Sequence, residues 1–262
     1  MDAVNKTLFI PLYGKALVSQ KGILLRDPRA EEIWAQAGFA LKGKSRSKWL
    51  AYYMAMRARV FDNWLSRQME AHPNAVVLHL GCGLDSRCRR VAAEGRAWYD
   101  VDFPQVIAQR RQFFGETEHY HMVGGDLREG EYLSGISGSE AIVVMEGVSM
   151  YLPPEQLREA LSRITERFDS CVLALDCYTS FAAKASRYKN PINEVGVTQV
   201  WGMDDPLVLE AAGLRFVSRL DMTPGELIAQ LAPTEQRIFR SLYAGKMSQN
   251  LYRLYEYRSD KL

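Results

Sequence analysis

The first quarter of the chain has apolar residues at helical spacing. Between residues 48 and 69 they recur every three or four positions, as in an amphipathic helix. These residues are Leu50, Tyr53, Met54, Val60, Phe61, Trp64 and Leu65. The signal stops at His72-Pro73-Asn74, because proline cannot continue a helix. The pattern predicts a helical N-terminal segment over residues 1–72.

Beyond residue 73 the pattern changes to short apolar runs, separated by stretches long enough for helices such as 154–168. The runs cover residues 75–80, 96–102, 119–126, 141–147 and 171–178. Alternating strands and helices with apolar strands are typical of βαβ units around a parallel sheet. Residues 73–178 are therefore predicted to form the core of an α/β fold.

Two more strands are expected near the C-terminus, at 214–220 and 250–258. Along 250–258, successive side chains would point to opposite faces of the sheet, and the pattern predicts an edge strand with one solvated face. One set is Leu251, Arg253, Tyr255 and Tyr257, and the other is Tyr252, Leu254, Glu256 and Arg258. No internal repeat or low-complexity linker is seen. We expect a single domain over residues 1–262, with residues 179–262 following the core as a C-terminal segment.

Composition narrows the class of protein. The 33 Lys and Arg nearly balance the 31 Asp and Glu, which disfavours a dedicated binder of nucleic acid or anionic membranes. Pro11 and Gly14 interrupt the apolar N-terminus, and no stretch approaches the roughly 18 apolar residues of a membrane span. We expect a cytoplasmic protein with reduced thiols and with neither nucleic acid nor membrane as partner.

No metal site is predicted. Five residues separate the cysteines of each pair, Cys82 with Cys88 and Cys171 with Cys177, and no histidine nearby completes a ligand set. His119 and His121 alternate along one run without a third ligand.

A glycine turn follows the first strand, as Gly81-Cys82-Gly83-Leu84-Asp85. Glycine allows positive φ and a close approach of ligand to backbone. Asp102 ends the next strand, 19 residues after Gly83, the spacing of an acid that binds ribose hydroxyls. Dinucleotide-binding proteins and S-adenosylmethionine methyltransferases both use this arrangement. Ser86 occupies the third glycine position of a dinucleotide site, and Asp85 suits a cationic sulfonium, which favours the methyltransferase.

Further acidic residues end the next two strands. Asp126-Leu127 follows the third strand, where a carboxylate and a backbone N–H could bind adenine, and Glu146 ends the fourth. Ligands of open α/β sheets bind at the carboxyl ends of the strands. The sequence thus predicts the glycine turn and three carboxylates along one edge of the sheet.

Several segments spread over most of the chain form one combined pattern: 7–17, 57–62, VVLHLGCGLDSR (76–87), WYDVDFPQVIAQRRQFF (98–114), VVMEGVSMYLP (143–153) and VWGMDDPLVLE (200–210). Together they resemble the leucine carboxyl methyltransferase family, which includes phosphatase carboxyl methyltransferases and bacterial O-methyltransferases of the tetracenomycin polyketide type. The resemblance implies the class I S-adenosylmethionine methyltransferase fold. That fold is Rossmann-like, with a seven-stranded sheet whose last strand is antiparallel, and here it would carry a helical N-terminal cap. Residues 250–258 could supply the antiparallel strand.

The resemblance also implies roles for individual residues. Gly81 and Gly83 would line the methionine part of S-adenosylmethionine, Asp102 would hold the ribose, and Asp126 with Leu127 would contact adenine. Glu146 would face the methionine amino end. Arg57 would pair with the methionine carboxylate, with Arg59 as the alternative. His79 stands where the family commonly has Asn, and we interpret it as a hydrogen-bonded core side chain.

No catalytic residue can be named from the sequence. Tyr151 and Tyr13 are candidates for aromatic walls that position the acceptor, and acceptor specificity is assigned to the cap and to residues 178–203. The leading hypothesis is methyl-ester formation on a carboxylate of a small natural product, which needs no base because a carboxylate is already ionised. A phenol acceptor would need a base, with His79, His121 or Tyr151 as candidates. A protein C-terminus as acceptor, an NAD-dependent oxidoreductase and a catalytically silent binding protein remain alternatives.

Overall fold

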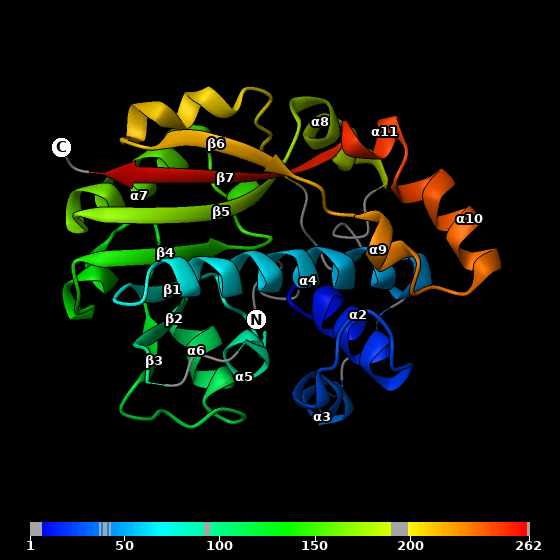
Figure 1. Cartoon of the computed structure of the whole chain (residues 1–262), viewed down its shortest axis with the longest axis horizontal. Coiled ribbons are helices and arrows are strands. Elements are labelled where there is room, and N and C mark those ends of the chain that lie inside the picture. Colours follow the sequence, from blue (N-terminus) through cyan, green and yellow to red (C-terminus); the bar gives the residue numbers. More distant parts are fainter. Residues whose placement is uncertain are drawn as a thin grey trace.

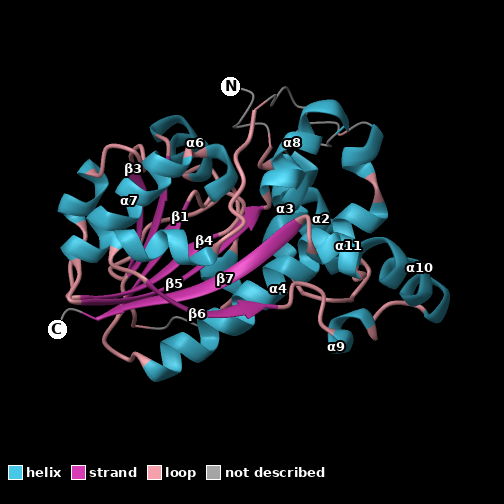
Figure 2. Ribbon diagram, turned by 90° about the horizontal axis from the view of Figure 1, so that it is seen from above, coloured by secondary structure: helices cyan, strands magenta, loops and turns pink. Residues whose placement is uncertain are grey.

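The chain builds one seven-stranded sheet with helices on both sides (Figures 1 and 2). The computed structural model describes residues 7–36, 38, 41, 43–91, 95–189 and 199–260. The strand order is β3-β2-β1-β4-β5-β7-β6. The strands are β1 (Val76–Leu80), β2 (Trp98–Asp102), β3 (Tyr120–Gly124), β4 (Glu140–Met145), β5 (Ser170–Tyr178), β6 (Arg215–Leu220) and β7 (Tyr252–Asp260). β1 to β5 are parallel, and β7 runs antiparallel to both β5 and β6.

Helices come before, between and after these strands. The α-helices are α2 (Phe9–Gln20), α3 (Pro28–Gln36), α4 (Lys48–Ala71), α5 (Arg87–Arg90), α6 (Pro104–Arg110), α7 (Pro154–Arg167), α8 (Ser180–Lys189), α9 (Gly225–Ile228), α10 (Pro233–Tyr243) and α11 (Lys246–Gln249). The 3₁₀-helices are η1 (Gly43–Arg46), η2 (Glu131–Gly135), η3 (Ser149–Tyr151) and η5 (Pro206–Ala212).

Successive residues of a strand point to opposite faces, and each face has its own hydrophobic core. On one face, Val77 packs with residues of α2 and α4, such as Trp64. On the other, Leu78 packs with residues of α7 and η5, such as Leu161. Both faces of the parallel strands are therefore covered, which explains why they read as continuous apolar runs.

The prediction of the fold is confirmed, including the helical N-terminus and the antiparallel last strand. One detail was wrong, because β7 is an interior strand between β5 and β6, and β6 is the edge strand on that side of the sheet. Tyr252 and Leu254 of β7 belong to the core beside α4, and Tyr255 and Tyr257 belong to the core beside α7. Glu256 of β7 is paired with its neighbours, since Gln68 of α4 and the Ser218 hydroxyl of β6 both donate to its carboxylate. Its place in the alternating pattern therefore marks a paired polar group and not a solvated one.

The four cysteines are free thiols. Among the described residues, no group of histidine, cysteine or carboxylate side chains is arranged to hold a metal ion. No helix in the described ranges is both long and apolar enough to cross a bilayer.

Candidate active site

A cavity of about 770 Å³ lies at the carboxyl ends of the parallel strands. All seven residues that the sequence assigns to a cofactor line it, from positions at or after the ends of β1 to β4 and from α4. They are Arg57, Gly81, Gly83, Asp102, Asp126, Leu127 and Glu146. The loops that follow parallel strands meet at one edge of the sheet, and this edge is the usual ligand site of such folds.

The turn after β1 depends on its two glycines. Gly81 has a φ of +64° and Gly83 a φ of +51°, values that side chains other than glycine rarely adopt. A Cβ at Gly81 would lie 2.3 Å from Cγ2 of Val148, in the loop after β4. The backbone of the turn can therefore lie against that loop only because residue 81 has no side chain.

Asp102 ties the end of β2 to the glycine turn. Its Oδ2 accepts a hydrogen bond from the Gly83 N–H at 2.7 Å, and its Oδ1 accepts one from the Phe103 N–H at 2.8 Å. Burial raises the pKa of Asp102, and these two N–H groups limit the rise. Each carboxylate oxygen has a second lone pair, so the group can still accept hydrogen bonds from two adjacent hydroxyls of a ligand.

Asp126 is held by its own loop. The backbone N–H of Arg128 donates to Asp126 Oδ1 at 2.9 Å, and the Arg128 guanidinium pairs with the same carboxylate. The hydrogen bonds from the Arg128 side chain lower the pKa of Asp126. Leu127, between the two, is buried in the core beside α7.

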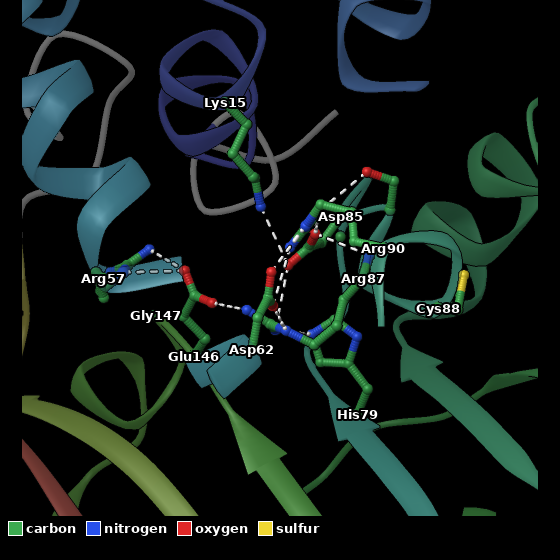
Figure 3. Close-up of polar contacts among 12 residues, drawn as sticks. Lys15, Arg57, Asp62, His79, Asp85, Arg87, Cys88, Arg90, Glu146 and Gly147 are labelled. Carbon is green, nitrogen blue, oxygen red and sulfur yellow. Dashed lines mark hydrogen bonds and ion pairs between the residues drawn. The ribbon is translucent and has the colours of Figure 1, made fainter. Parts of the chain in front are cut away.

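Glu146 belongs to a buried network of ion pairs beside the glycine turn (Figure 3). The Arg87 side chain is fully buried and contacts three carboxylates: Asp62 at 2.7 Å, Asp85 at 3.2 Å, and Glu146. Glu146 also pairs with Arg57 at 3.0 Å. Burial opposes the charge of Glu146, but the two guanidinium groups outweigh this effect and lower its pKa.

Asp85 does not offer a free charge to a ligand, which corrects the expectation from the sequence. Its carboxylate contacts Lys15 at 3.1 Å, Arg90 at 2.7 Å and Arg87 at 3.2 Å. Three cations thus neutralise it. The residue lines the cavity, but its carboxylate fixes the turn.

His79 is a hydrogen-bonded core side chain, as predicted. Its Nδ1 lies 3.0 Å from Asp100 Oδ1, and its Nε2 lies 3.1 Å from Arg87 Nη1. A guanidinium can only donate, so Nε2 accepts and Nδ1 carries the ring hydrogen. Asp100 in turn accepts hydrogen bonds from Arg110 and from the Tyr120 hydroxyl.

The structure distinguishes the two arginines that the sequence left as alternatives. Arg57 is 5% exposed and lines the cavity, whereas Arg59 is exposed on the same helix. Arg57 Nε donates to Glu146 at 3.0 Å, and its Nη1 donates to the Tyr252 hydroxyl at 2.7 Å. Nη1 also lies 3.1 Å from Asp176 Oδ2.

Tyrosines from several elements line the same cavity, among them Tyr53, Tyr151, Tyr178, Tyr243 and Tyr252. The rings of Tyr53 and Tyr243 are 5.3 Å apart, and those of Tyr178 and Tyr252 are 5.0 Å apart. Tyr151, predicted as an aromatic wall for the acceptor, is one of these lining residues. These rings give this part of the cavity an uncharged, largely apolar surface.

Tyr13 is not among the cavity-lining residues. Its ring packs on Trp34 at 5.1 Å, and its hydroxyl donates to the Arg46 carbonyl, so its contacts lie within the N-terminal helices. In the segment 178–203, the cavity wall includes Ala182, Ala185 and Ser186. Residues 190–198 and the side chains of 187–189 lie outside the described residues.

Three cavity neighbours escaped the sequence analysis. Asp176 lies near the end of β5, so the rule that selected the earlier strand ends could have found it. Lys15 and Tyr252 carry no such signal, because Lys15 sits within an N-terminal helix and Tyr252 meets Arg57 across 195 residues of sequence.

Sequence comparisons connect this arrangement to known proteins. The profile of the leucine carboxyl methyltransferase family matches residues 2–165. The tetracenomycin polyketide synthesis O-methyltransferase TcmP of Streptomyces glaucescens is 30% identical over 90% of this chain and 89% of its own length. An S-adenosyl-L-methionine-dependent methyltransferase, dpfgK, of Gibberella zeae is 32% identical over 84% of this chain and 83% of its own.

Solved structures share the fold at low sequence identity. A putative methyltransferase from Thermobifida fusca superposes with a TM-score of 0.59 and 14% identity over 88% of each chain. The magnesium protoporphyrin IX methyltransferase of Synechocystis, solved with bound S-adenosylhomocysteine, gives a TM-score of 0.52 and 12% identity over 89% of this chain and 93% of its own.

Proposed function

Because the chain belongs to the leucine carboxyl methyltransferase family, we propose that it transfers a methyl group to a carboxylate oxygen of a small organic acid. The protein is an S-adenosylmethionine-dependent methyltransferase. The cofactor supplies an activated methyl group on a sulfonium centre. The remaining task of the protein is to hold two reactants in line and to exclude water.

The cavity fits this cofactor. In this proposal the backbone of the glycine turn would lie against the methionine part, Asp102 has acceptor capacity for the two ribose hydroxyls, and Asp126 with Leu127 would contact adenine. Arg57 and Glu146, which pair with each other, would receive the carboxylate and the ammonium group of the methionine.

We expect Asp102→Ala to weaken the binding of S-adenosylhomocysteine by about 1.5–3 kcal/mol, since hydrogen bonds from the ribose to a charged acceptor are lost. Titration calorimetry measures the change. Asp205→Ala is the matched control, because Asp205 also accepts a backbone N–H, that of Leu207 at 2.9 Å, but does not line the cavity. Unchanged affinity in Asp102→Ala would place the ribose elsewhere.

The carboxylate acceptor is supported by the state of the three candidate bases. Both ring nitrogens of His79 are engaged, and His121 stacks on Tyr99 at 4.9 Å and is not part of the cavity lining. Burial raises the pKa of Tyr151, which keeps its hydroxyl protonated. None of the three therefore offers a free base for a phenol, and a carboxylate needs no base.

A small molecule is favoured over a protein terminus as acceptor. The relative from Streptomyces glaucescens is named for polyketide synthesis, and the tyrosine-lined part of the cavity suits a compact apolar molecule. NAD is disfavoured, because Ser86 occupies the third glycine position of a dinucleotide site and the Arg87 N–H after it already donates to Asp85, so this amide is not available to a pyrophosphate.

The test is methyl transfer from labelled S-adenosylmethionine onto a panel of aromatic and aliphatic acids, with the matching phenols as controls. We expect methyl esters from acids, with kcat/KM nearly constant between about pH 6 and 9, because carboxylates are ionised throughout this range. A rate confined to phenols and rising with pH would overturn the carboxylate assignment and leave the cofactor assignment standing.

A further inference from the structure

Asp176 is a fully buried carboxylate next to the cavity, with an exposure of 0%, and it is not among the lining residues. Its Oδ1 accepts the Gly147 N–H at 2.6 Å. Its Oδ2 accepts the Tyr252 hydroxyl at 2.5 Å and lies 3.1 Å from Arg57 Nη1. One carboxyl group thus contacts the loop after β4, a strand near the C-terminus and the N-terminal helix α4.

These contacts form a closed triangle. The Tyr252 hydroxyl donates to Asp176 and accepts a hydrogen bond from Arg57, which also pairs with Asp176. The hydroxyl has a single hydrogen, so its direction is fixed once Asp176 accepts it. The orientation of the guanidinium therefore depends on both partners.

Arg57 and Tyr252, the two residues that Asp176 holds, belong to different parts of the cavity. Arg57 pairs with Glu146, where the proposed function puts the methionine part of the cofactor. Tyr252 packs on Tyr53 and Tyr178, in the tyrosine-lined part. Because Gly147 follows Glu146, the bond from its N–H to Asp176 also holds the loop that carries the glutamate.

We infer that Asp176 is a positioning residue that sets Arg57 for the cofactor and Tyr252 for the acceptor through one shared carboxyl group. It touches neither reactant. The charge of its carboxylate holds the Arg57 guanidinium and the Tyr252 hydroxyl in fixed positions. Methyl transfer requires such fixed positions, because the two reactants must be aligned. The acceptor half of this inference rests on the proposed function, and the cofactor half does not.

The test compares three variants by calorimetry with S-adenosylhomocysteine and by steady-state kinetics. Asp176→Asn keeps the shape and removes the charge, and Tyr252→Phe keeps the ring and removes the hydroxyl. Ser149→Ala is the matched structural control, because the Ser149 hydroxyl donates to the Asp176 main-chain carbonyl but the residue is outside the cavity lining.

We expect Asp176→Asn to weaken S-adenosylhomocysteine binding about tenfold, which is the scale of one lost charge-assisted hydrogen bond. The KM of both substrates should also rise. Tyr252→Phe should have a smaller effect on the cofactor. The double variant should resemble Asp176→Asn alone, because the two groups act as a unit. Ser149→Ala should lower Tm and leave cofactor affinity as it is.

Wild-type affinity in Asp176→Asn, or additive effects in the double variant, would overturn the inference. So would a loss of affinity in Ser149→Ala that matches Asp176→Asn at equal Tm. If Asp176→Asn does not fold, Tyr252→Phe alone still tests the triangle, since unchanged binding and KM there would contradict it. Calorimetry needs no acceptor, so failure to methylate acids would leave the cofactor result interpretable.

Discussion

Replacing Arg87 by methionine is expected to lower the free energy of unfolding by about 3–5 kcal/mol, the cost of removing one partner from a buried ion pair. Methionine fills much of the space but leaves Asp62 and Glu146 each with one cation fewer. Arg87 also donates to His79, whose Nε2 would lose its partner. Urea unfolding followed by circular dichroism measures the change.

The stability lost in Arg87→Met should become smaller as the pH falls. Arg87 helps to lower the pKa of Glu146 below its ordinary value of 4.5, so this part of the stabilisation is complete above about pH 5. It disappears as the pH falls through the lowered pKa, and the difference between wild type and Arg87→Met should shrink there.

Arg111→Met is the surface control. Arg111 lies 3.6 Å from Glu116 with both side chains largely exposed, and such pairs contribute about 1 kcal/mol or less. If Arg87→Met cost no more than Arg111→Met, the buried network would have little part in stability.

The fold was predictable because each element carries its own local signal. Buried parallel strands such as β1 are continuous apolar runs, and α7 shows its buried face at helical spacing. The position of β7 within the sheet was not predictable in this way. Strand order is set by pairing between segments that are distant in the sequence. β7 pairs with the much earlier β5, where Cys171 lies opposite Ser259.

The site was predictable where topology alone brings residues together. Asp102 ends a parallel strand, Gly83 and Glu146 follow two others, and such strand ends meet at one edge of the sheet. The partners of these residues were not predictable. The neutralisation of Asp85 by Lys15, and the contact of Arg57 with Tyr252, depend on how the N-terminal helices dock on the sheet. No spacing in the sequence records that docking.

Replacing Gly81 by alanine is expected to lower the free energy of unfolding by about 2–4 kcal/mol and to weaken cofactor binding more than tenfold. A side chain at φ +64° costs about 1–2 kcal/mol, and overpacking adds a comparable amount. The added Cβ would lie 2.3 Å from Val148 Cγ2, so Val148, in the loop after β4, must shift. That loop also carries Glu146 and Gly147, so the displacement reaches the contacts of Arg57 and Asp176.

Two variants separate backbone strain from the clash. Gly95 has a φ of +71° and nothing within 4 Å of an added Cβ, so Gly95→Ala should show the strain of about 1–2 kcal/mol with normal cofactor affinity. Val148→Ala combined with Gly81→Ala makes room for the new methyl group and should recover part of the lost affinity. Because strain at residue 81 persists in the double variant, full recovery of stability is not expected. If Gly81→Ala bound S-adenosylhomocysteine like the wild type, the methionine end of the cofactor would not pass along this turn.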